Sequence, residues 1–238
     1  MLKSLILCAG RGIRMKSYSL VVPKPLLVVP GHKKPLMHEL IQHLRSQHLN
    51  DITISLAYKK EFIKAYCIDE KLDVRILESE YSYDTAGTAR FYLDNGLLKS
   101  EDSLLMINGD IFTTMDFNRM FRFHQAEKSD FTIAYKDYIK SIPFGVLSLE
   151  QNKVVSVYEK PSYSASIIIG IYILSYGVIS TKLQPGEVID MPSLIDRCIK
   201  DRNVVIKGYK LQDEEIWTAF EFEDQIKNNI NIEDYDEY

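Results

Sequence analysis

The sequence predicts an α/β protein built on a doubly wound, Rossmann-like, mostly parallel sheet with a small antiparallel β extension. Over the first 135 residues, apolar strand-like runs alternate with segments of helical spacing, as in parallel strands joined by helices on both faces of a sheet. After about residue 144 the strand-like runs follow one another closely, which is typical of antiparallel pairing. A chain of 238 residues, 46% of them hydrophobic, is long enough to bury such a core.

The strands and helices of the first part follow from the spacing of their apolar residues. Leu2–Leu7 is almost continuously apolar, as expected of a strand that is covered on both faces. Four further runs are predicted to be strands: Ile52–Ala57, Val74–Leu77, Leu104–Ile107 and Phe131–Tyr135. The segments between them have apolar residues at helical spacing and are predicted to be helices: Met37–Leu44, Glu61–Cys67, Thr88–Leu97 and Phe117–Glu127.

The second part begins with segments that we expect to pair antiparallel. These strands are predicted at Gly145–Leu149, Val154–Glu159 and Ile167–Leu174, with a turn at Gln151-Asn152 between the first two. The remaining elements are expected to be a helix at Met191–Lys200, a strand at Val204–Tyr209 and a last helix from about Glu223. We expect a single domain over residues 1–230 and an acidic tail over residues 231–238.

The composition excludes several classes of protein. The net charge is −4, and four acids among the last eight residues account for all of it, so nothing favours nucleic acid as a partner. No run of about 18 apolar residues and no leader pattern is present, so we expect a cytoplasmic protein without a membrane partner. The cysteines, Cys8, Cys67 and Cys198, lack the spacing of metal ligands and are expected to be reduced core thiols.

A glycine-containing loop with cations follows the first strand. Gly10 and Gly12 can bring backbone N–H groups close to an anion, and Arg14 and Lys24 lie within reach of a phosphate chain. Ligands of open parallel sheets bind beyond the carboxyl ends of the strands, where this loop begins. The loop matches neither the P-loop pattern nor the dinucleotide fingerprint. It therefore predicts a phosphate compound held in another way.

The sequence around this loop resembles the sugar-1-phosphate nucleotidylyltransferases. Leu7-Cys-Ala-Gly-Arg-Gly-Ile-Arg-Met15 and Val22-Pro-Lys-Pro-Leu26 are similar to that family's LAGGxGTRL and PKPLLPV at the same separation. Further similar motifs follow in the family's order: Asp84–Ala89, Asn108–Asp110, Phe144–Val146, Glu159–Pro161 and Gly170–Tyr172. The segment Ile189–Leu194 is similar to one in hexose- and heptose-1-phosphate guanylyltransferases.

The resemblance implies a fold, a reaction and a set of site residues. The fold would be that of the nucleotide-diphospho-sugar transferases, which is GT-A-like. The reaction would join a nucleoside triphosphate to a sugar 1-phosphate and release pyrophosphate, using Mg²⁺, for capsule, lipopolysaccharide or glycoconjugate synthesis. The resemblance leaves a homo-oligomer open.

Roles carry over from the family motifs as expectations. Arg14 would hold the triphosphate, Lys24 would face the α-phosphate, and Asp110 would bind the metal at the end of an apolar strand. The remaining nucleotide-binding residues would be Ala9, Gly10, Arg11, Gly12, Gly87 and Asn108. Lys160 would hold the acceptor phosphate, and the other substrate-binding residues would be Gly145, Glu159 and Gly170.

The match to the family breaks at a few positions. Ile13 replaces a hydroxyl residue of the phosphate loop, Asp84 replaces a glycine, and Ile168 stands where many members have a sugar-binding asparagine. One alignment of the C-terminal motif places Thr218 at the second metal position. An alignment on Trp217 offers Glu221 instead, and a carboxylate suits Mg²⁺ better than a hydroxyl. Glu221 is therefore predicted as the second metal ligand.

Two other functions stay open on the sequence. One is a cytidylyltransferase that acts on a non-sugar phosphate such as choline phosphate, and the other is a catalytically silent nucleotide-binding or regulatory paralogue. Taken singly, Arg14 or Lys24 also fits a solvated loop cation, and Asp110 fits a turn acid. Their joint occurrence at strand ends favours the transferase.

Overall fold

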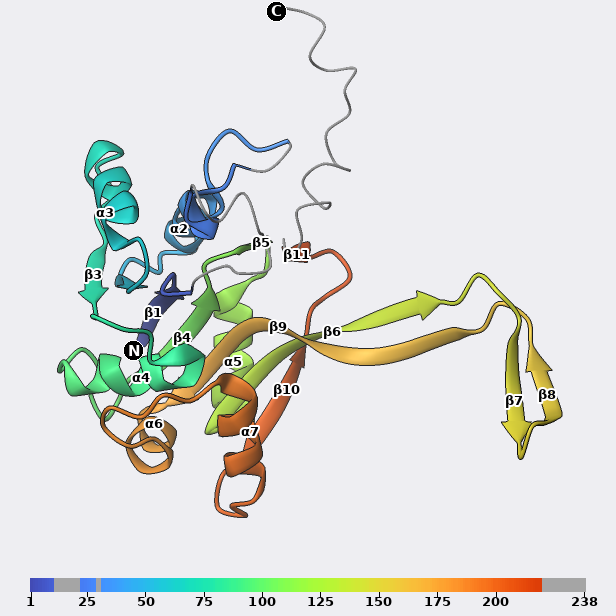
Figure 1. Cartoon of the computed structure of the whole chain (residues 1–238). Helices are drawn as coiled ribbons and strands as arrows, with labels where there is room; N and C mark the ends of the chain where they lie inside the picture. Colours follow the sequence, from blue (N-terminus) through green and yellow to red (C-terminus); the bar gives the residue numbers. More distant parts are fainter. Residues whose placement is uncertain (11–21, 29–30, 220–238) are drawn as a thin grey trace, which may run out of the picture.

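The computed structural model describes residues 1–10, 22–28 and 31–219. Its centre is a seven-stranded sheet with the order β10-β6-β9-β4-β1-β2-β3 (Figure 1). These strands are β1 (Leu2–Leu7), β2 (Ile52–Leu56), β3 (Arg75–Glu78), β4 (Ser103–Asn108), β6 (Phe131–Ser141), β9 (Ser162–Ser175) and β10 (Ile206–Lys210). All neighbouring pairs are parallel except those of β9, which runs antiparallel to β4 and β6. The predicted mostly parallel α/β fold is confirmed.

The helices lie on both faces of this sheet. They are α2 (Leu36–Ser46), α3 (Lys60–Asp69), α4 (Asp84–Asp94), α5 (Phe117–Ala126), α6 (Tyr176–Lys182) and α7 (Met191–Ile199), with a short 3-10 turn η2 (Lys24–Leu26). Asp116 and Asp190 cap α5 and α7, since their carboxylates accept hydrogen bonds from the N–H groups of Arg119 and Ser193. The seven-residue α6, which the sequence analysis did not predict, starts at Ser175 in the same way.

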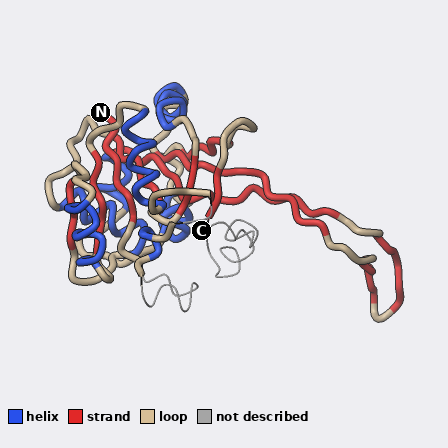
Figure 2. Tube along the Cα trace, turned by 90° about the horizontal axis from the view of Figure 1, so that it is seen from above, coloured by secondary structure: helices blue, strands red, loops and turns tan. Residues whose placement is uncertain are grey.

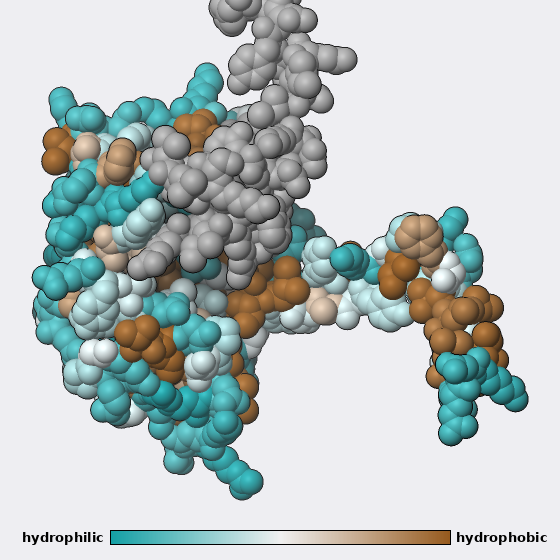
Figure 3. Space-filling model, viewed as in Figure 1, coloured by the Kyte–Doolittle hydropathy of each residue, from teal (hydrophilic) through white to brown (hydrophobic). Residues whose placement is uncertain are grey.

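The strands β6 and β9 continue beyond the body of the molecule as a two-stranded ribbon (Figure 2). At its outer end, β7 (Val146–Glu150) and β8 (Lys153–Tyr158) form a separate antiparallel hairpin. Gln151 and Asn152 form the predicted turn, with φ of 45° and 69°, the backbone that two-residue hairpin turns need. We call residues 136–168 the arm. Figure 3 shows hydrophobic residues gathered near the outer end of the arm.

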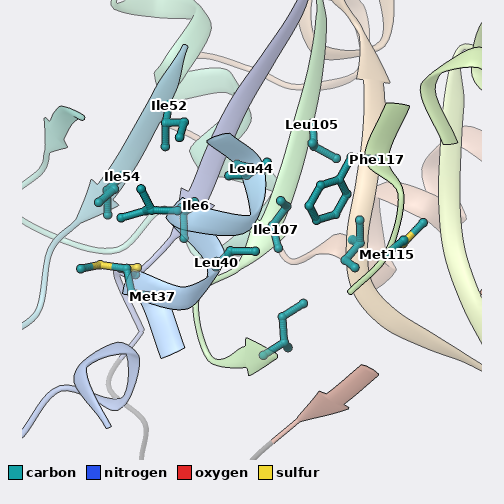
Figure 4. Close-up of a cluster of buried hydrophobic side chains, with 14 of the residues drawn as sticks. Ile6, Met37, Leu40, Leu44, Ile52, Ile54, Leu105, Ile107, Met115 and Phe117 are labelled. Carbon is teal, nitrogen blue, oxygen red and sulfur yellow. The ribbon is translucent and has the colours of Figure 1, made fainter. Parts of the chain in front are cut away.

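The core of the body has two layers, one on each face of the sheet, and successive side chains of β1 point into them alternately. Ile6 belongs to a cluster with Met37, Leu44 and Phe117 beneath α2 and α5 (Figure 4). Leu5, one residue earlier, points to the opposite cluster, which α4, α6 and α7 cover. Both residues are fully buried. The sheet is therefore covered on both faces, as a doubly wound fold requires.

Several boundaries differ from the predictions. The helix predicted to begin at Thr88 begins at Asp84 instead, because its first N–H groups bond to the chain near residue 189. Two short strands, β5 (Ile111–Thr113) and β11 (Trp217–Ala219), pair antiparallel and were not predicted. The helix from about Glu223 and the acidic tail lie outside the described residues. Among the described residues, no helix combines the length and apolar character needed to cross a bilayer.

Candidate active site

The carboxyl ends of β1 and β4 bring two of the quoted motifs together. The strands are parallel neighbours, with Leu7 opposite Asn108. The N–H of Gly109 donates to the carbonyl of Leu7 at 3.0 Å. A Cβ on Gly109 would lie 2.5 Å from Cys8 Sγ and 2.9 Å from the Leu7 carbonyl oxygen. Only glycine fits at position 109, because any side chain would collide with these atoms. The close contact of the two chain segments sets Asp110 beside the start of the glycine loop. The sequence analysis gave Gly109 no role, although it lies inside a quoted motif.

Lys24 meets Asp110 across this edge. Its Nζ lies 2.6 Å from Asp110 Oδ2, and the exposed fractions of the two side chains are 12% and 32%. The Pro23-Lys24-Pro25 sequence favours the turn that positions Lys24, because proline fixes the backbone on either side. The structure thus joins two of the predicted site residues that are 86 positions apart in sequence.

These residues line a cavity of about 170 Å³. One wall comes from the ends of β1 and β4 and from η2, and contains Cys8, Ala9, Gly10, Lys24, Asn108 and Asp110. The opposite wall comes from the start of α4 and the residues before it: Ser82, Asp84, Thr85 and Thr88. Burial, and to a lesser degree the Asp110 carboxylate, raises the pKa of the Cys8 thiol well above its usual value. The surroundings of Cys8 thus disfavour its thiolate form.

The α4 wall is fixed by a segment more than a hundred residues later. The N–H groups of Ala86 and Gly87 both donate to the Ile189 carbonyl at 3.0 Å. The N–H of Met191 donates to Thr85 Oγ1 at 2.8 Å. Asp84 has a φ of 61°, a left-handed backbone that aspartate tolerates better than most residues. Asp84, which stands where the family has a glycine, lines the cavity.

Two glycines predicted to touch ligands pack instead against protein atoms. Gly87 lies inside α4, and a Cβ there would fall 2.3 Å from the Glu187 carbonyl oxygen. The prediction of a ligand-facing loop glycine is wrong at Gly87, because the protein itself fills the space above it. Gly170 has a φ of 75°, and a Cβ would fall 2.5 Å from Asn108 Nδ2. Gly170 therefore positions Asn108, which lines the cavity.

The predicted substrate-binding residues of the second part are not at this cavity. Gly145, Glu159 and Lys160 lie near the hairpin β7–β8 at the outer end of the arm, far from the β1 and β4 ends in Figure 1. Glu159 and Gly145 are neighbours there, since a Cβ on Gly145 would lie 3.3 Å from Glu159 Oε2. Lys160, predicted to hold the acceptor phosphate, therefore lies away from this cavity in the single chain, because the ribbon of β6 and β9 runs outward.

Of the residues considered as metal ligands, the structure describes Asp110 and Thr218 but not Glu221. Thr218 lies in β11, opposite Phe112 of β5, the strand that begins directly after Asp110. Trp217 Nε1 donates to the Ile169 carbonyl at 2.7 Å and so fixes β11 on β9. Glu221, Arg11, Gly12 and Arg14 lie outside the described residues. Within the described ranges, no group of three or more His, Cys, Asp or Glu side chains could hold a metal ion.

Comparisons with known proteins match almost the whole chain. A family model described as nucleotidyl transferase covers residues 3–200. The D-glycero-α-D-manno-heptose 1-phosphate guanylyltransferase of Aneurinibacillus thermoaerophilus is 27% identical over 74% of this chain and 76% of that protein. The probable glucose-1-phosphate cytidylyltransferase of Bacillus subtilis is 23% identical over 97% of this chain and 94% of that protein. The solved structure of HddC from Yersinia pseudotuberculosis complexed with GMP-PN is 22% identical and superposes with a TM-score of 0.71, covering 96% of this chain and 98% of that one. This structural match shows a shared fold.

Proposed function

The chain belongs to the nucleotidyl transferase family, and on that premise we propose that it joins a nucleoside triphosphate to a sugar 1-phosphate, giving a nucleotide sugar and pyrophosphate. The observation that carries the proposal is the meeting of Lys24 and Asp110 in a cavity at the carboxyl edge of the sheet. A cation and a carboxylate placed together there suit the handling of phosphate and a metal. The names of the guanylyl- and cytidylyltransferase relatives support the same reaction class.

The reaction is a substitution at phosphorus. An oxygen of the sugar 1-phosphate attacks the α-phosphorus of the triphosphate, and the bond from that phosphorus to the bridging oxygen breaks. Pyrophosphate leaves with the electron pair. The protein contributes mainly position and charge in such a reaction, because both reactants are anions. The attacking oxygen belongs to the sugar 1-phosphate, so no protein nucleophile is needed.

Lys24 and the glycine loop are assigned to the triphosphate. The Lys24 ammonium group would move from Asp110 to the α-phosphate, where it offsets the charge that develops in the transition state. Gly10 is exposed, and no described atom lies within 4 Å of the place where its Cβ would be. We assign to Gly10 a backbone contact with a phosphate of the nucleotide. Arg14, Arg11 and Gly12 keep the nucleotide-binding roles that the resemblance implies.

Asp110 is assigned to a Mg²⁺ ion. Its carboxylate is partly exposed at the cavity, and carboxylate oxygens are ligands that Mg²⁺ prefers. When bound, Mg²⁺ supplies positive charge to the phosphate oxygens. In the free protein Lys24 neutralises Asp110, so we expect Mg²⁺ to bind weakly alone and better together with the triphosphate. Glu221 stays the proposed second ligand.

The identity of the sugar depends on the α4 wall. Asp84 presents a carboxylate where the family has a glycine, and carboxylates accept hydrogen bonds from hydroxyl groups and from base N–H groups. We propose that Asp84 makes such a contact and so narrows the choice of substrate. A nucleotide sugar made from such substrates in the cytoplasm would serve surface-polysaccharide or glycoconjugate synthesis.

A pyrophosphate-release assay tests the proposed function. The full chain is incubated with each of four nucleoside triphosphates, with Mg²⁺, and with a panel of sugar 1-phosphates and choline phosphate. Release with a sugar 1-phosphate supports the proposal. Release with choline phosphate alone supports the non-sugar cytidylyltransferase, and no release with any pair supports the silent paralogue.

A pair of lysine variants ties the activity to the cavity. Lys24→Ala should abolish most of the release. Lys34→Ala is the matched control, since Lys34 Nζ also makes an ion pair, with Glu70 Oε2 at 2.7 Å, but does not line the cavity. Equal activity of the two variants would contradict the assignment of Lys24.

A further inference from the structure

The segment between α6 and α7 lies against the α4 wall of the cavity. We call residues 183–190 the connector, and the three helices cover the same face of the sheet (Figure 1). Near its end, the carbonyl of Ile189 accepts two N–H groups of α4, and the N–H of Ile189 donates to the Tyr83 carbonyl at 3.2 Å. The connector therefore supplies partners that the first turn of α4 cannot find within its own helix.

The middle of the connector is not held by apolar packing. Leu183 and Ile189, near its ends, are buried, but the five residues between them are exposed or half-buried. The chain turns sharply at Gly186, whose φ is 75°, and the N–H of Glu187 donates back to the Gln184 carbonyl at 3.2 Å. This bond fixes the shape of the connector but not its place beside α4.

An ion pair with α7 holds the connector in place. The guanidinium group of Arg197 donates to Glu187 Oε1 at 2.6 Å and to Glu187 Oε2 at 3.0 Å. It also donates to the Lys182 carbonyl at 2.5 Å, and the N–H of Gln184 donates to Glu187 Oε2 at 3.0 Å. Two parallel bonds between a guanidinium group and a carboxylate fix direction as well as distance. Arg197 thus ties the turn of the connector to α7.

The connector and α4 touch so closely that a shift of one moves the other. A Cβ on Gly87 would lie 2.3 Å from the Glu187 carbonyl oxygen, so the residue that Arg197 holds bears directly on α4. Further along the same helix, Arg90 donates to the carbonyls of Ser180 at 3.2 Å and Leu183 at 2.8 Å. Helix α4 is therefore bonded to the chain near both ends of the connector.

We propose that Arg197 and Glu187 are positioning residues for the substrate that lies against the α4 wall. Neither is among the described residues that line the cavity. Their ion pair sets the place of the connector, and the connector sets the start of α4, where Asp84 lines the cavity. The effect on a substrate rests on the proposed function, whereas the effect on the position of α4 does not.

Amide hydrogen exchange tests the position of α4 independently of activity. In Arg197→Ala, the amides of Ala86 and Gly87 should exchange about 10-fold faster, because the connector that accepts their hydrogen bonds is no longer held. The amides of β1 should keep their rates, which excludes global unfolding as the cause. Lys207→Ala is the control, since the Lys207 side chain is 40% exposed, as is that of Arg197, and pairs with Glu127 at 2.9 Å beyond the end of α5. Unchanged exchange at both α4 amides in Arg197→Ala would overturn the proposal.

Steady-state kinetics tests the effect on a substrate. Asp84→Ala alters the wall directly and shows which KM, that of the triphosphate or that of the sugar 1-phosphate, reports contact with α4. Arg197→Ala should raise the same KM by about 10-fold and leave kcat within about 3-fold, because a displaced wall weakens binding without touching Lys24 or Asp110. Loss of folded protein alone would lower kcat and leave KM unchanged.

The kinetic outcomes separate this proposal from the proposed function. A rise only in the other KM, or in neither, would contradict the positioning role of Arg197. An unmodified chain without activity on any substrate pair would contradict the proposed function instead, and the exchange result would still decide whether Arg197 positions α4.

Two milder changes keep the test decisive if Arg197→Ala does not fold. Arg197→Lys keeps the charge but loses the two parallel bonds, so its KM should lie between those of the unmodified chain and Asp84→Ala. Gly87→Ala presses a methyl group against the Glu187 carbonyl and should raise the same KM. Gly177→Ala on α6 is the matched control, because its new Cβ would meet its nearest neighbour at 3.7 Å, and it should change neither KM. Equal KM values for the two glycine variants would refute the link between the connector and the wall.

Discussion

Strand β9 passes through two different environments within one chain. Its second half, in the body, is buried on both faces: Ile171 and Ile173 lie in the cluster beneath α2 and α5, and Tyr172 and Leu174 lie in the opposite cluster. Its first half, in the arm, is mostly exposed. The change falls at Gly170, with its positive φ, and at a register shift between Ile133 and Tyr135 of β6. The body thus buries β9 on both faces, whereas most of the arm is exposed in the single chain.

The comparison places two groups of predicted site residues in different regions of the chain. The body holds the ion pair of Lys24, in η2, and Asp110, which follows β4. The arm holds Lys160 between β8 and β9. Variants in the two regions should therefore fail differently, in chemistry or stability for the body and in acceptor binding for the arm.

The largest effect is expected at the cavity. Asp110→Asn should lower turnover by about 100-fold to 1,000-fold, as expected when charge opposite a developing anion is lost. Asp94→Asn is the matched control, because Asp94 is about equally exposed, at 33%, and is paired with Arg90 at 2.8 Å on α4. Steady-state pyrophosphate release measures both. An Asp110→Asn enzyme with full activity that also ignores a chelator would refute the metal assignment.

Alanine substitution of two isoleucines of β9 should lower the free energy of unfolding by different amounts in the body and in the arm. Ile171 is fully buried in the body, and Ile171→Ala should cost about 2–5 kcal/mol of unfolding free energy. Ile168, at the base of the arm, is 45% exposed, and Ile168→Ala should cost less than about 1 kcal/mol. Urea unfolding measures both costs. Equal costs would show that the base of the arm is packed as tightly as the body.

A smaller effect is expected in the arm. Lys160→Ala should raise the KM for the sugar 1-phosphate by about 10-fold to 100-fold, the loss expected for a charge-assisted contact of about 1.5–3 kcal/mol. The affinity for the nucleoside triphosphate, measured by calorimetry, should not change. The reverse pattern, with nucleotide binding lost and acceptor kinetics intact, would reverse the two sites.

The smallest effect concerns pH and the body. His124 on α5 is 4% exposed, and its Nδ1 lies 2.8 Å from Thr132 Oγ1 on β6. Burial lowers its pKa below 6.5, against a weaker opposing influence of Asp130. The unfolded chain therefore binds this proton first, so the contribution of His124 is complete above about pH 6.5 and is lost as the pH falls toward the folded pKa. His124→Gln should reduce the acid slope of unfolding free energy by up to about 1.4 kcal/mol per pH unit. An unchanged slope in urea titrations between neutral and mildly acidic pH would show that His124 does not titrate on unfolding.

The central sheet could be predicted because its strands are long apolar runs. Leu2–Leu7 and Ile52–Leu56 need no tertiary information beyond burial on both faces. The meeting of Lys24 with Asp110 was predictable in outline, since the strands before the two motifs end at the same edge. Short elements such as β5 and β11, with three residues each, carry too little periodicity to be recognised.

Other features depend on contacts that are remote in sequence. Gly87 was assigned to a loop because its packing partner, Glu187, is a hundred positions away. The hairpin β7–β8 was predictable from its alternation and turn, but not its position, because the direction of the ribbon depends on the bulge and on Gly170. The cap of α6 at Ser175 was a signal in the sequence that could have revealed that helix.

The bonds between α4 and residues 189–191 have an evolutionary consequence. Asp84, Thr85 and Thr88 line the cavity, but the position of their helix is set by the carbonyl of Ile189 and the N–H of Met191. A substitution that shifts the backbone of that distant segment would move the wall while leaving every wall residue unchanged. Natural selection for a different sugar can therefore act on positions that the sugar never touches, and two descendants with identical cavity residues can diverge in substrate.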